Sequence, residues 1–466
     1  MNWQWNRNVR QIRNGISALA IAATVGWITP VEAQESEDTR AELAEMRAQI
    51  KAMAARIDSL ETQLDMAKQR AATTASVGDI AVSANQSMPE NAKAPDAIAW
   101  KGAPEVESSD GWTFKPRGRL QYDAGFTSVP SSSGRVDGFG SELRRARLGV
   151  EGDIPGGFGY KMELDFAGGT AEVTDAILSY QDKGLTVTVG QQNNFQGLEE
   201  LTSSRFTSMM ERAAFTDAFN FERRVGLALQ YSSGPILLQG GVFSDNYDDL
   251  SNKNWGLDGR AVFLPKIGNT QLHLAGSLHY TSLQELSTVR YRHRPLVHFT
   301  SDRFIDTGAL DAESEIGYGL EAAAIHGPFH FASEGYWQHL IRPGALSDPT
   351  FFGGYTEIGM FLTPGDSRRY KKGVFDRAKP SSPVGNGGFG SVEVNLRYDY
   401  LDLTDAGIVG GTQNGYQLSV VWAPIDYVRF LLNYARLDYT DALHAIPGTS
   451  RNYSVDAFGA RAQIDF

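Results

Sequence analysis

From about residue 118 to the end of the chain, apolar and polar residues alternate in segments of about ten residues. In the last segment, the clearest one, the apolar positions are Phe458, Ala460, Ala462, Ile464 and Phe466. The positions between them are Gly459, Arg461, Gln463 and Asp465. Successive side chains of a β-strand point to opposite faces, so this period of two predicts strands with one apolar and one polar face.

Such strands occur in soluble sandwiches and in membrane-spanning barrels, and three features favour a barrel. Short turns at 181–184, 232–235, 325–328 and 423–426 alternate with longer polar segments. Aromatic residues gather near strand ends, where a membrane interface would hold them: Trp337, Trp422, Tyr427, Tyr434 and Tyr439. The final residue, Phe466, resembles the terminal aromatic residue of outer-membrane barrels. We count about sixteen strands, and predict an all-β, transmembrane antiparallel barrel with an aqueous channel over residues 111–466.

The N-terminus has the features of an export signal. Three arginines precede an apolar run from Ile16 to Ile28, and a small-residue cleavage pattern follows at 31–33. The alternative is a membrane anchor, for which this run is short. We predict a signal peptide over residues 1–33.

Residues 34–70 show a different period. Apolar residues from Leu43 to Ala67 recur at alternating spacings of three and four, which predicts a short α-helical coiled coil. A single amphipathic helix packed on a domain is the alternative. Residues 71–110 are rich in Ala, Ser, Pro and acidic residues without periodicity, which predicts a flexible linker between the coiled coil and the barrel.

Composition excludes several function classes. The 466-residue chain has a formal net charge of -12, which argues against a nucleic-acid partner. It has no cysteine, which excludes thiol catalysis and Cys-ligated metal centres. Its histidines lack a third ligand at metal-binding spacing, and no nucleophile and base stand out. We therefore predict no enzyme activity, no metal site and no cofactor.

Several motifs resemble those of the phosphate-selective porins O and P. In chain order they are Arg117–Gln121, Leu143–Arg147, Val173–Ala176, Val189–Gln191, Gly197–Ser204 and Met210–Arg212. The resemblance runs from about Gly118 to Phe466 and implies a homotrimeric sixteen-stranded channel, surrounded by the lipid of a Gram-negative outer membrane. It also implies that the third loop, about 191–220, folds into the pore. A row of basic side chains would lead small anions such as phosphate to this constriction.

One candidate for the basic row is an alternating arginine segment. Arg290, Arg292 and Arg294 share one face if the segment is extended, and their place resembles the arginine row of the family. Without the resemblance, a solvated loop is the simpler interpretation. A second basic segment, 368–379, is rich in Pro and Gly and is typical of a solvated loop as much as of a vestibule.

Other candidates lie near the constriction. Arg144 and Arg145 resemble the paired arginines of the family, although in a regular strand only one of them faces the lumen. A bulge would change that alternation. Arg205 and Arg212 in the third loop are further candidates for basic pore-lining residues.

The third loop also departs from the family pattern. Glu199 and Glu200 are candidate acidic residues of the constriction, and Glu200 stands where the phosphate-selective members carry a lysine. A carboxylate at a narrow site repels anions by the electrostatics that a lysine uses to attract them.

The sequence therefore predicts a passive channel for small hydrophilic solutes that prefers anions such as phosphate. One alternative is a general or weakly cation-selective porin on the same scaffold. Another is a structural protein that tethers the envelope, because the predicted coiled coil would lie in the periplasm and could contact the cell wall.

Overall fold

A computed structural model describes residues 97–466 except 136, 250–252 and 447–450. The predicted signal peptide and coiled coil, and the larger part of the predicted linker, lie outside the described residues. Among the residues that are described, no helix is long and apolar enough to cross a membrane.

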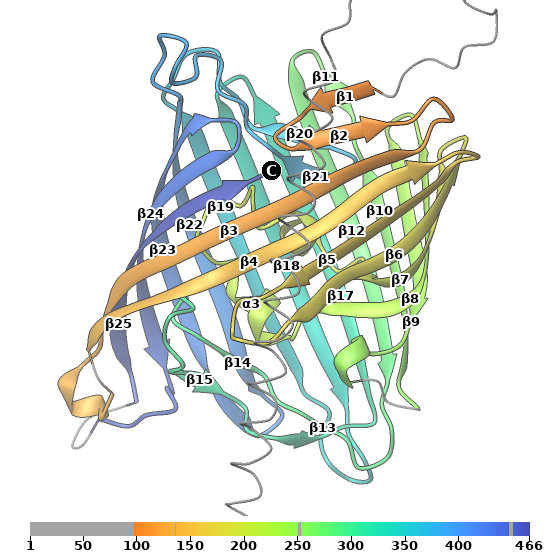
Figure 1. Ribbon diagram of the computed structural model, residues 1–466. Coiled ribbons are helices and arrows are strands. Elements are labelled where there is room, and N and C mark those ends of the chain that lie inside the picture. The colour runs from red at the N-terminus through yellow and green to blue at the C-terminus, as the bar shows by residue number, and fades with distance from the viewer. Residues whose placement is uncertain (1–96, 136, 250–252, 447–450) are drawn as a thin grey trace, which may run out of the picture. The chain divides into compact units, whose positions relative to one another are not determined.

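Within the described residues, sixteen strands form one closed antiparallel barrel (Figure 1), which confirms the predicted class and strand number. They are β3 (Thr113–Ser128), β4 (Gly138–Ile154), β5 (Phe158–Asp165), β6 (Glu172–Asp182), β7 (Leu185–Asn193), β8 (Arg223–Ser233), β9 (Ile236–Phe243), β10 (Trp255–Phe263), β12 (Thr270–Ser282), β17 (Ser314–His326), β18 (Phe329–Ile341), β19 (Thr350–Phe361), β22 (Ser391–Asp405), β23 (Ile408–Ile425), β24 (Val428–Thr440) and β25 (Tyr453–Asp465). Each strand pairs with the next, and β25 closes the ring on β3, for example at Phe458 and Phe126.

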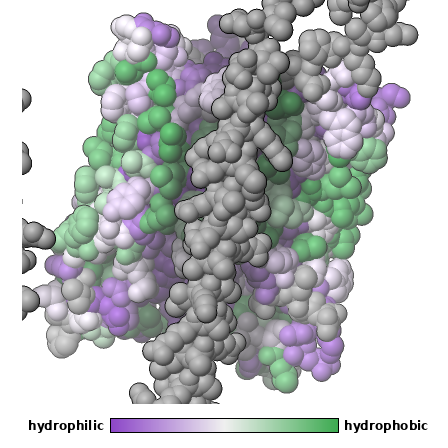
Figure 2. All heavy atoms as spheres, in the orientation of Figure 1, coloured by the Kyte–Doolittle hydropathy of each residue, from purple (hydrophilic) through white to green (hydrophobic). Residues whose placement is uncertain are grey.

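The period of two in the sequence separates the two faces of the wall. On β22, Asn395 and Arg397 point inwards and are buried, whereas Leu396 and Tyr398 are exposed on the outside. Figure 2 shows hydrophobic side chains along the sides of the barrel and hydrophilic ones towards its rims. An apolar outer face and a polar inner face are what a transmembrane barrel requires.

The connections differ between the two ends of the barrel. All four predicted short turns are present, at 183–184, 234–235, 327–328 and 426–427, and we call their end of the barrel the turn end. The chain also finishes there, because Asp465 pairs with Arg119 near the start of β3. The opposite, loop end carries longer connections, apart from the two-residue turn 406–407 between β22 and β23. In outer-membrane barrels the short turns lie on the periplasmic side.

Two long connections from the loop end fold into the barrel. The third loop, 194–222, contains α2 (Leu198–Leu201) and α3 (Ala214–Ala218). The fifth loop, 283–313, contains β13 (Thr288–Val289), β14 (Arg292–His293), β15 (Ile305–Asp306) and β16 (Leu310–Asp311). Two short turns of helix, Ser131–Ser133 and Tyr247–Asp249, lie in other loops at this end.

Part of the lumen is an apolar core, which the sequence pattern did not predict. Phe215 of α3 stacks on Tyr336 of β18 with ring centroids 5.9 Å apart. Phe304 of the fifth loop stacks on Tyr439 of β24 at 5.2 Å. The inward positions of β24 and β25 near the loop end are therefore apolar, because they pack against the fifth loop and not against water.

A third connection enters the barrel from the turn end. Residues 362–390, which we call the inward turn, contain β20 (Arg369–Lys371) and β21 (Val374–Asp376). Arg368 is buried, and its guanidinium donates to the hydroxyl of Ser208 at 2.8 Å and to the carbonyl of Phe206 at 2.6 Å. At Arg368, the interpretation of 368–379 as a solvated loop is thus wrong, because the segment packs against the third loop.

The last part of the predicted linker is also structured. β1 (Ala97–Trp100) and β2 (Pro104–Glu107) form a hairpin that pairs with the start of β3. Each strand has only four residues, too few for a period of two to stand out in the sequence. A short strand β11 (Lys266–Ile267) completes the elements at the turn end.

Candidate functional site

Carboxylates of the barrel wall hold the third loop through its backbone. Glu334 on β18 accepts hydrogen bonds from the N–H groups of Leu198 at 2.9 Å and Glu199 at 2.7 Å, where α2 begins. Asp399 on β22 accepts from the N–H of Ala214 at 3.0 Å, where α3 begins. The first N–H groups of a helix have no partner inside the helix, so these wall side chains satisfy them and fix both helices.

Wall arginines neutralise acidic side chains of the same loop. Arg397 on β22 contacts Glu199 at 2.9 Å and Glu357 at 2.7 Å. Arg461 on β25 contacts Glu211 at 2.8 Å. Glu199, a predicted acidic residue of the constriction, is therefore buried in an ion pair with the wall and is not among the residues that line the cavity beside the loop.

A polar cavity of about 470 Å³ lies between the third and fifth loops and the wall from β3 to β8. Its basic lining residues are Arg117, Arg119, Arg144, Arg145, Arg147, Lys161, Arg205, Arg212, Arg223 and Arg294. Its acidic lining residues are Glu163, Asp165, Glu172, Asp175, Glu200, Glu211, Asp217, Glu222 and Asp248. Ten cations face nine carboxylates, so selectivity depends on which charges lack a nearby counter-charge.

A β-bulge in β4 decides how the paired arginines point. The pairing with β3 passes from Gln121 opposite Arg145 to Tyr122 opposite Leu143, so Arg144 is an extra residue. Both Arg144 and Arg145 line the cavity, while Leu143 is exposed on the outer face. The expectation that only one of the two faces the lumen is corrected, because the bulge breaks the alternation between them.

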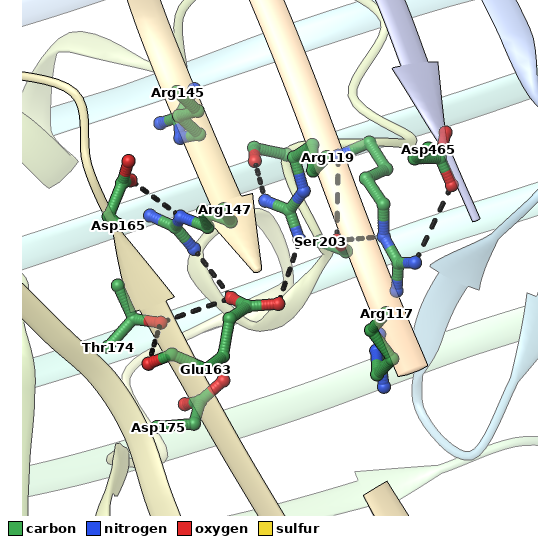
Figure 3. Close-up of polar contacts among 12 residues, drawn as sticks. Arg117, Arg119, Arg145, Arg147, Glu163, Asp165, Thr174, Asp175, Ser203 and Asp465 are labelled. Atoms are coloured by element: carbon green, nitrogen blue, oxygen red, sulfur yellow. Dashed lines mark hydrogen bonds and ion pairs between the residues drawn. The ribbon is translucent and has the colours of Figure 1, made fainter. Parts of the chain in front are cut away.

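Ion pairs between neighbouring strands compensate most cations of the wall. Arg147 lies 2.7 Å from Asp165 and 3.1 Å from Glu163 (Figure 3). Lys161 contacts Asp175 at 2.5 Å, and Arg223 contacts the same carboxylate at 3.0 Å. Paired opposite charges present a small net field to an ion that passes them.

Arg145 is the exception. In the part of the chain that the structure describes, each of the other nine cavity cations has a carboxylate partner, and Arg145 has no ion pair. Its Nη1 donates to Oε1 of the neutral Gln121 at 2.9 Å. Figure 3 shows its guanidinium without a contact to the other residues drawn. An uncompensated positive charge therefore faces the cavity beside the third loop.

The sequence of the barrel matches one known family of channels. The model of the family described as phosphate-selective porin O and P matches residues 114–466. The chain belongs to this family. An uncharacterized protein of Caulobacter vibrioides is 43% identical over 479 residues, which cover 97% of this porin and 96% of that protein.

Two solved porins share the fold at low sequence identity. An anion-selective porin from Comamonas acidovorans has a TM-score of 0.52 and 13% identity, over 76% of this chain and 100% of that chain. The trimer form of OmpT, an outer-membrane protein of Vibrio cholerae, has a TM-score of 0.50 and 12% identity, over 77% of this chain and 100% of that chain. Family and fold together place this porin in the outer membrane and indicate a channel rather than an enzyme.

Among the third-loop carboxylates that line the cavity of this porin, Glu200 and Glu211 have different electrostatic surroundings. Glu200 lies 3.2 Å from Arg212. Burial raises the pKa of the Glu200 carboxyl, and Arg212 only partly offsets this. Burial acts on Glu211 in the same sense, but Arg144 and Arg461 outweigh it and hold the pKa of Glu211 well below its usual range. Glu211 therefore stays ionised, and of these two carboxylates Glu200 is the one that acid neutralises first.

The alternating arginines of the fifth loop divide between two environments. Arg294 lines the cavity, 3.6 Å from Asp217 of α3. Arg290 and Arg292 are exposed and lie outside the cavity lining. Arg290 contacts Asp306 at 2.6 Å, on the strand that pairs with β14. A row formed by all three arginines stays a prediction.

The sequence predicted Arg205 as a pore-lining residue, and Arg205 does line the cavity, 3.5 Å from Asp465. Other basic residues of the neighbouring barrel wall were not predicted. Arg117, Arg119 and Lys161 line the cavity as well. A signal was available in the period of two, because the polar positions of each predicted strand share the face of the lumen. The carboxylate partners could not be found in this way, because they lie on neighbouring strands whose register the sequence does not state.

Proposed function

We propose that this porin is a passive channel for small hydrophilic solutes that prefers anions, phosphate or ions like it. The observation that carries the proposal is the uncompensated Arg145 at the third loop. Arg119 adds to it, because its ion pair with Glu163 is long, 3.9 Å, and its Nη1 donates to the hydroxyl of Ser204 at 2.7 Å. Guanidinium groups offer several N–H donors to the oxygens of an anion such as phosphate.

Two further facts support an anion preference. The family is described as phosphate-selective, and one structural neighbour is described as an anion-selective porin. A specific observation favours the alternative, a general or weakly cation-selective channel. Glu200 lines the cavity at the position where the phosphate-selective members that this chain resembles carry lysine.

Planar-bilayer recording of the purified porin tests the proposal. In a gradient of potassium chloride, the current should reverse on the side of zero that chloride selectivity dictates, and inorganic phosphate at low concentration should reduce the chloride current. A reversal potential of the cation-selective sign, without block by phosphate, would mean that the carboxylates dominate, and the anion-selective proposal would be rejected.

We also propose that the porin is a homotrimer whose residues 34–70 form a periplasmic coiled coil that supports the assembly or contacts the cell wall. The support is the unbroken heptad spacing and the trimers of the resembling family. Deletion of residues 35–72 should lower the temperature at which the trimer dissociates on a gel. A deletion variant with an equally heat-resistant trimer would argue against a stabilising role of the coiled coil.

A further inference from the structure

The β1–β2 hairpin occupies a step in the seam where the barrel closes. β25 pairs with β3 only from Arg119 onwards, and Phe466 then bonds to the backbone of Gly118. The first residues of β3 extend past that point, and β2 pairs with Thr113 and Phe114 on that stretch. Figure 1 shows β1, β2, β3 and β4 side by side in this order at the turn end. The stagger of strands that closes a barrel leaves such a step, and the hairpin covers it.

The tip of the hairpin is fitted to the rim of the barrel. Gly102 has a positive φ of 83°, and a Cβ at this position would lie 2.5 Å from the ring of Tyr427. Tyr427 belongs to the turn between β23 and β24. The hairpin therefore packs against the barrel at its base through β3 and at its tip through Tyr427.

One face of the hairpin is apolar and exposed. Ile98 pairs with Val106, and Val106 pairs with Phe114, so these three side chains share a face. Ile98 is 73% exposed and Phe114 46% exposed. Trp100 follows Ile98 by two residues, lies on the same face, and is 76% exposed.

The opposite face is charged. Lys101 and Glu105 form an ion pair at 2.7 Å, and Glu107 lies on the same side of the hairpin. The hairpin is thus amphipathic, although its strands are too short to cross a membrane. Four exposed apolar side chains on one face, one of them a tryptophan, are unusual on a surface that meets only water.

The apolar face continues the membrane-facing surface of the barrel. Along β3, Phe114 is in phase with Leu120 and Tyr122, which are exposed on the outside of the wall. We infer that the β1–β2 hairpin is a membrane-interface anchor, whose apolar face lies in the boundary between headgroups and acyl chains of the periplasmic phospholipid leaflet. Amphipathic segments that carry tryptophan settle at this depth. A phospholipid surface fits the hairpin better than a second copy of this chain, because the apolar face of the hairpin is in phase with the outer face of β3, which lipid covers.

Introduced cysteines give a direct test, because the chain has none of its own. Ile98→Cys places a thiol on the apolar face, and Ala99→Cys, one residue along the same exposed strand, places one on the charged face. Each is labelled with an environment-sensitive fluorophore, and the full mature porin is reconstituted into phosphatidylcholine vesicles with or without lipids brominated near the headgroup. We expect brominated lipid to reduce the fluorescence at position 98 about two-fold or more, and to leave position 99 nearly unchanged.

A second pair of positions guards against a local artefact. Val106→Cys and Glu105→Cys repeat the comparison on β2, and heat-modifiable gel mobility checks that each barrel is folded. Equal quenching on both faces, or none on either, would overturn the inference. Disulfide cross-linking of two copies through Ile98→Cys, with no quenching by lipid, would also overturn it and would assign the face to a contact between copies. If a labelled variant fails to fold, Trp100→Phe replaces it: brominated lipid should quench a smaller part of the tryptophan fluorescence than in the unaltered porin, and an equal quenched part would overturn the inference.

Discussion

Replacement of Arg145 by glutamine removes one positive charge from the cavity and leaves a shorter polar side chain. In the structure the Arg145 guanidinium donates to Gln121 at 2.9 Å and has no ion pair. The glutamine amide is neutral and can still donate and accept hydrogen bonds in the polar cavity. No carboxylate loses its partner, so Arg145→Gln should leave the barrel folded, unlike the removal of a cation from a buried ion pair.

The size of the effect follows from the interaction of one guanidinium with a passing anion. Two unit charges about 4 Å apart interact with about 1 kcal/mol in bulk water and about 4 kcal/mol at the effective dielectric constant near a protein surface. For a polar cavity lined by charged side chains we use values towards the lower of these limits. We expect a loss of about 1–2 kcal/mol in anion stabilisation, which lowers anion occupancy beside the third loop about 5- to 30-fold.

Reversal potentials in a potassium chloride gradient measure this change. Arg145→Gln should move the reversal potential towards the cation-selective side and weaken the block by phosphate. Arg292→Gln is the matched control, because this arginine is exposed, lies outside the cavity lining and forms no ion pair with another described residue. If Arg145→Gln has the selectivity of the unaltered porin, or Arg292→Gln shifts it as far, the assignment of selectivity to an uncompensated Arg145 is refuted.

Further predictions concern the third loop. Glu200→Gln should raise the anion-to-cation permeability ratio. Because burial raises the pKa of Glu200, the permeability ratio of the unaltered porin should also rise as the pH falls, whereas that of the variant should not. Reversal potentials over a pH series measure both effects, and a permeability ratio of the unaltered porin that does not change with pH would contradict the prediction. Glu334→Gln weakens the hydrogen-bond acceptor for the first N–H groups of α2, so we expect a loss of about 1–3 kcal/mol in the anchoring of the third loop. The single-channel current should then flicker, whereas a steady current would contradict this anchoring role. Phe215→Ala removes a ring that stacks on Tyr336, so the free energy of unfolding measured in urea should fall by about 3–5 kcal/mol. The single-channel conductance should increase, and an unchanged conductance would mean that this apolar core does not limit the width of the channel.

The wall of the barrel could be predicted from sequence because its signal is local. Alternation with a period of two identifies strands and their faces, and four short turns fixed the order of elements at the turn end. The apolar core inside the barrel could not be found in this way. Tyr439 and Phe304 meet only because the fifth loop folds back on the wall, and Tyr439 alternates as any strand residue does.

The candidate site likewise has residues that the sequence identified and contacts that it could not predict. Arg144 and Arg145 were named from their motif, but the bulge that turns both inwards appears only in the pairing of β4 with β3. Arg368 lay in a segment with the composition of a solvated loop, and its burial depends on contacts with the third loop. In both cases the decisive contact joins residues far apart in the chain, and local patterning carries no information about it.

The arrangement of charges couples the fold of the third loop to the selectivity of the channel. Arg397 and Arg461 draw Glu199 and Glu211 into ion pairs with the wall, so the cations that hold the loop also limit its negative field in the cavity. Loss of Arg397 would leave Glu199 without its ion-pair partner and would remove the arginine that contacts Glu357, at a cost of about 3–5 kcal/mol for a broken buried pair, and would change structure and selectivity together. Arg145 has no such structural partner, so it is the position at which the electrostatics of permeation can be altered separately from the fold.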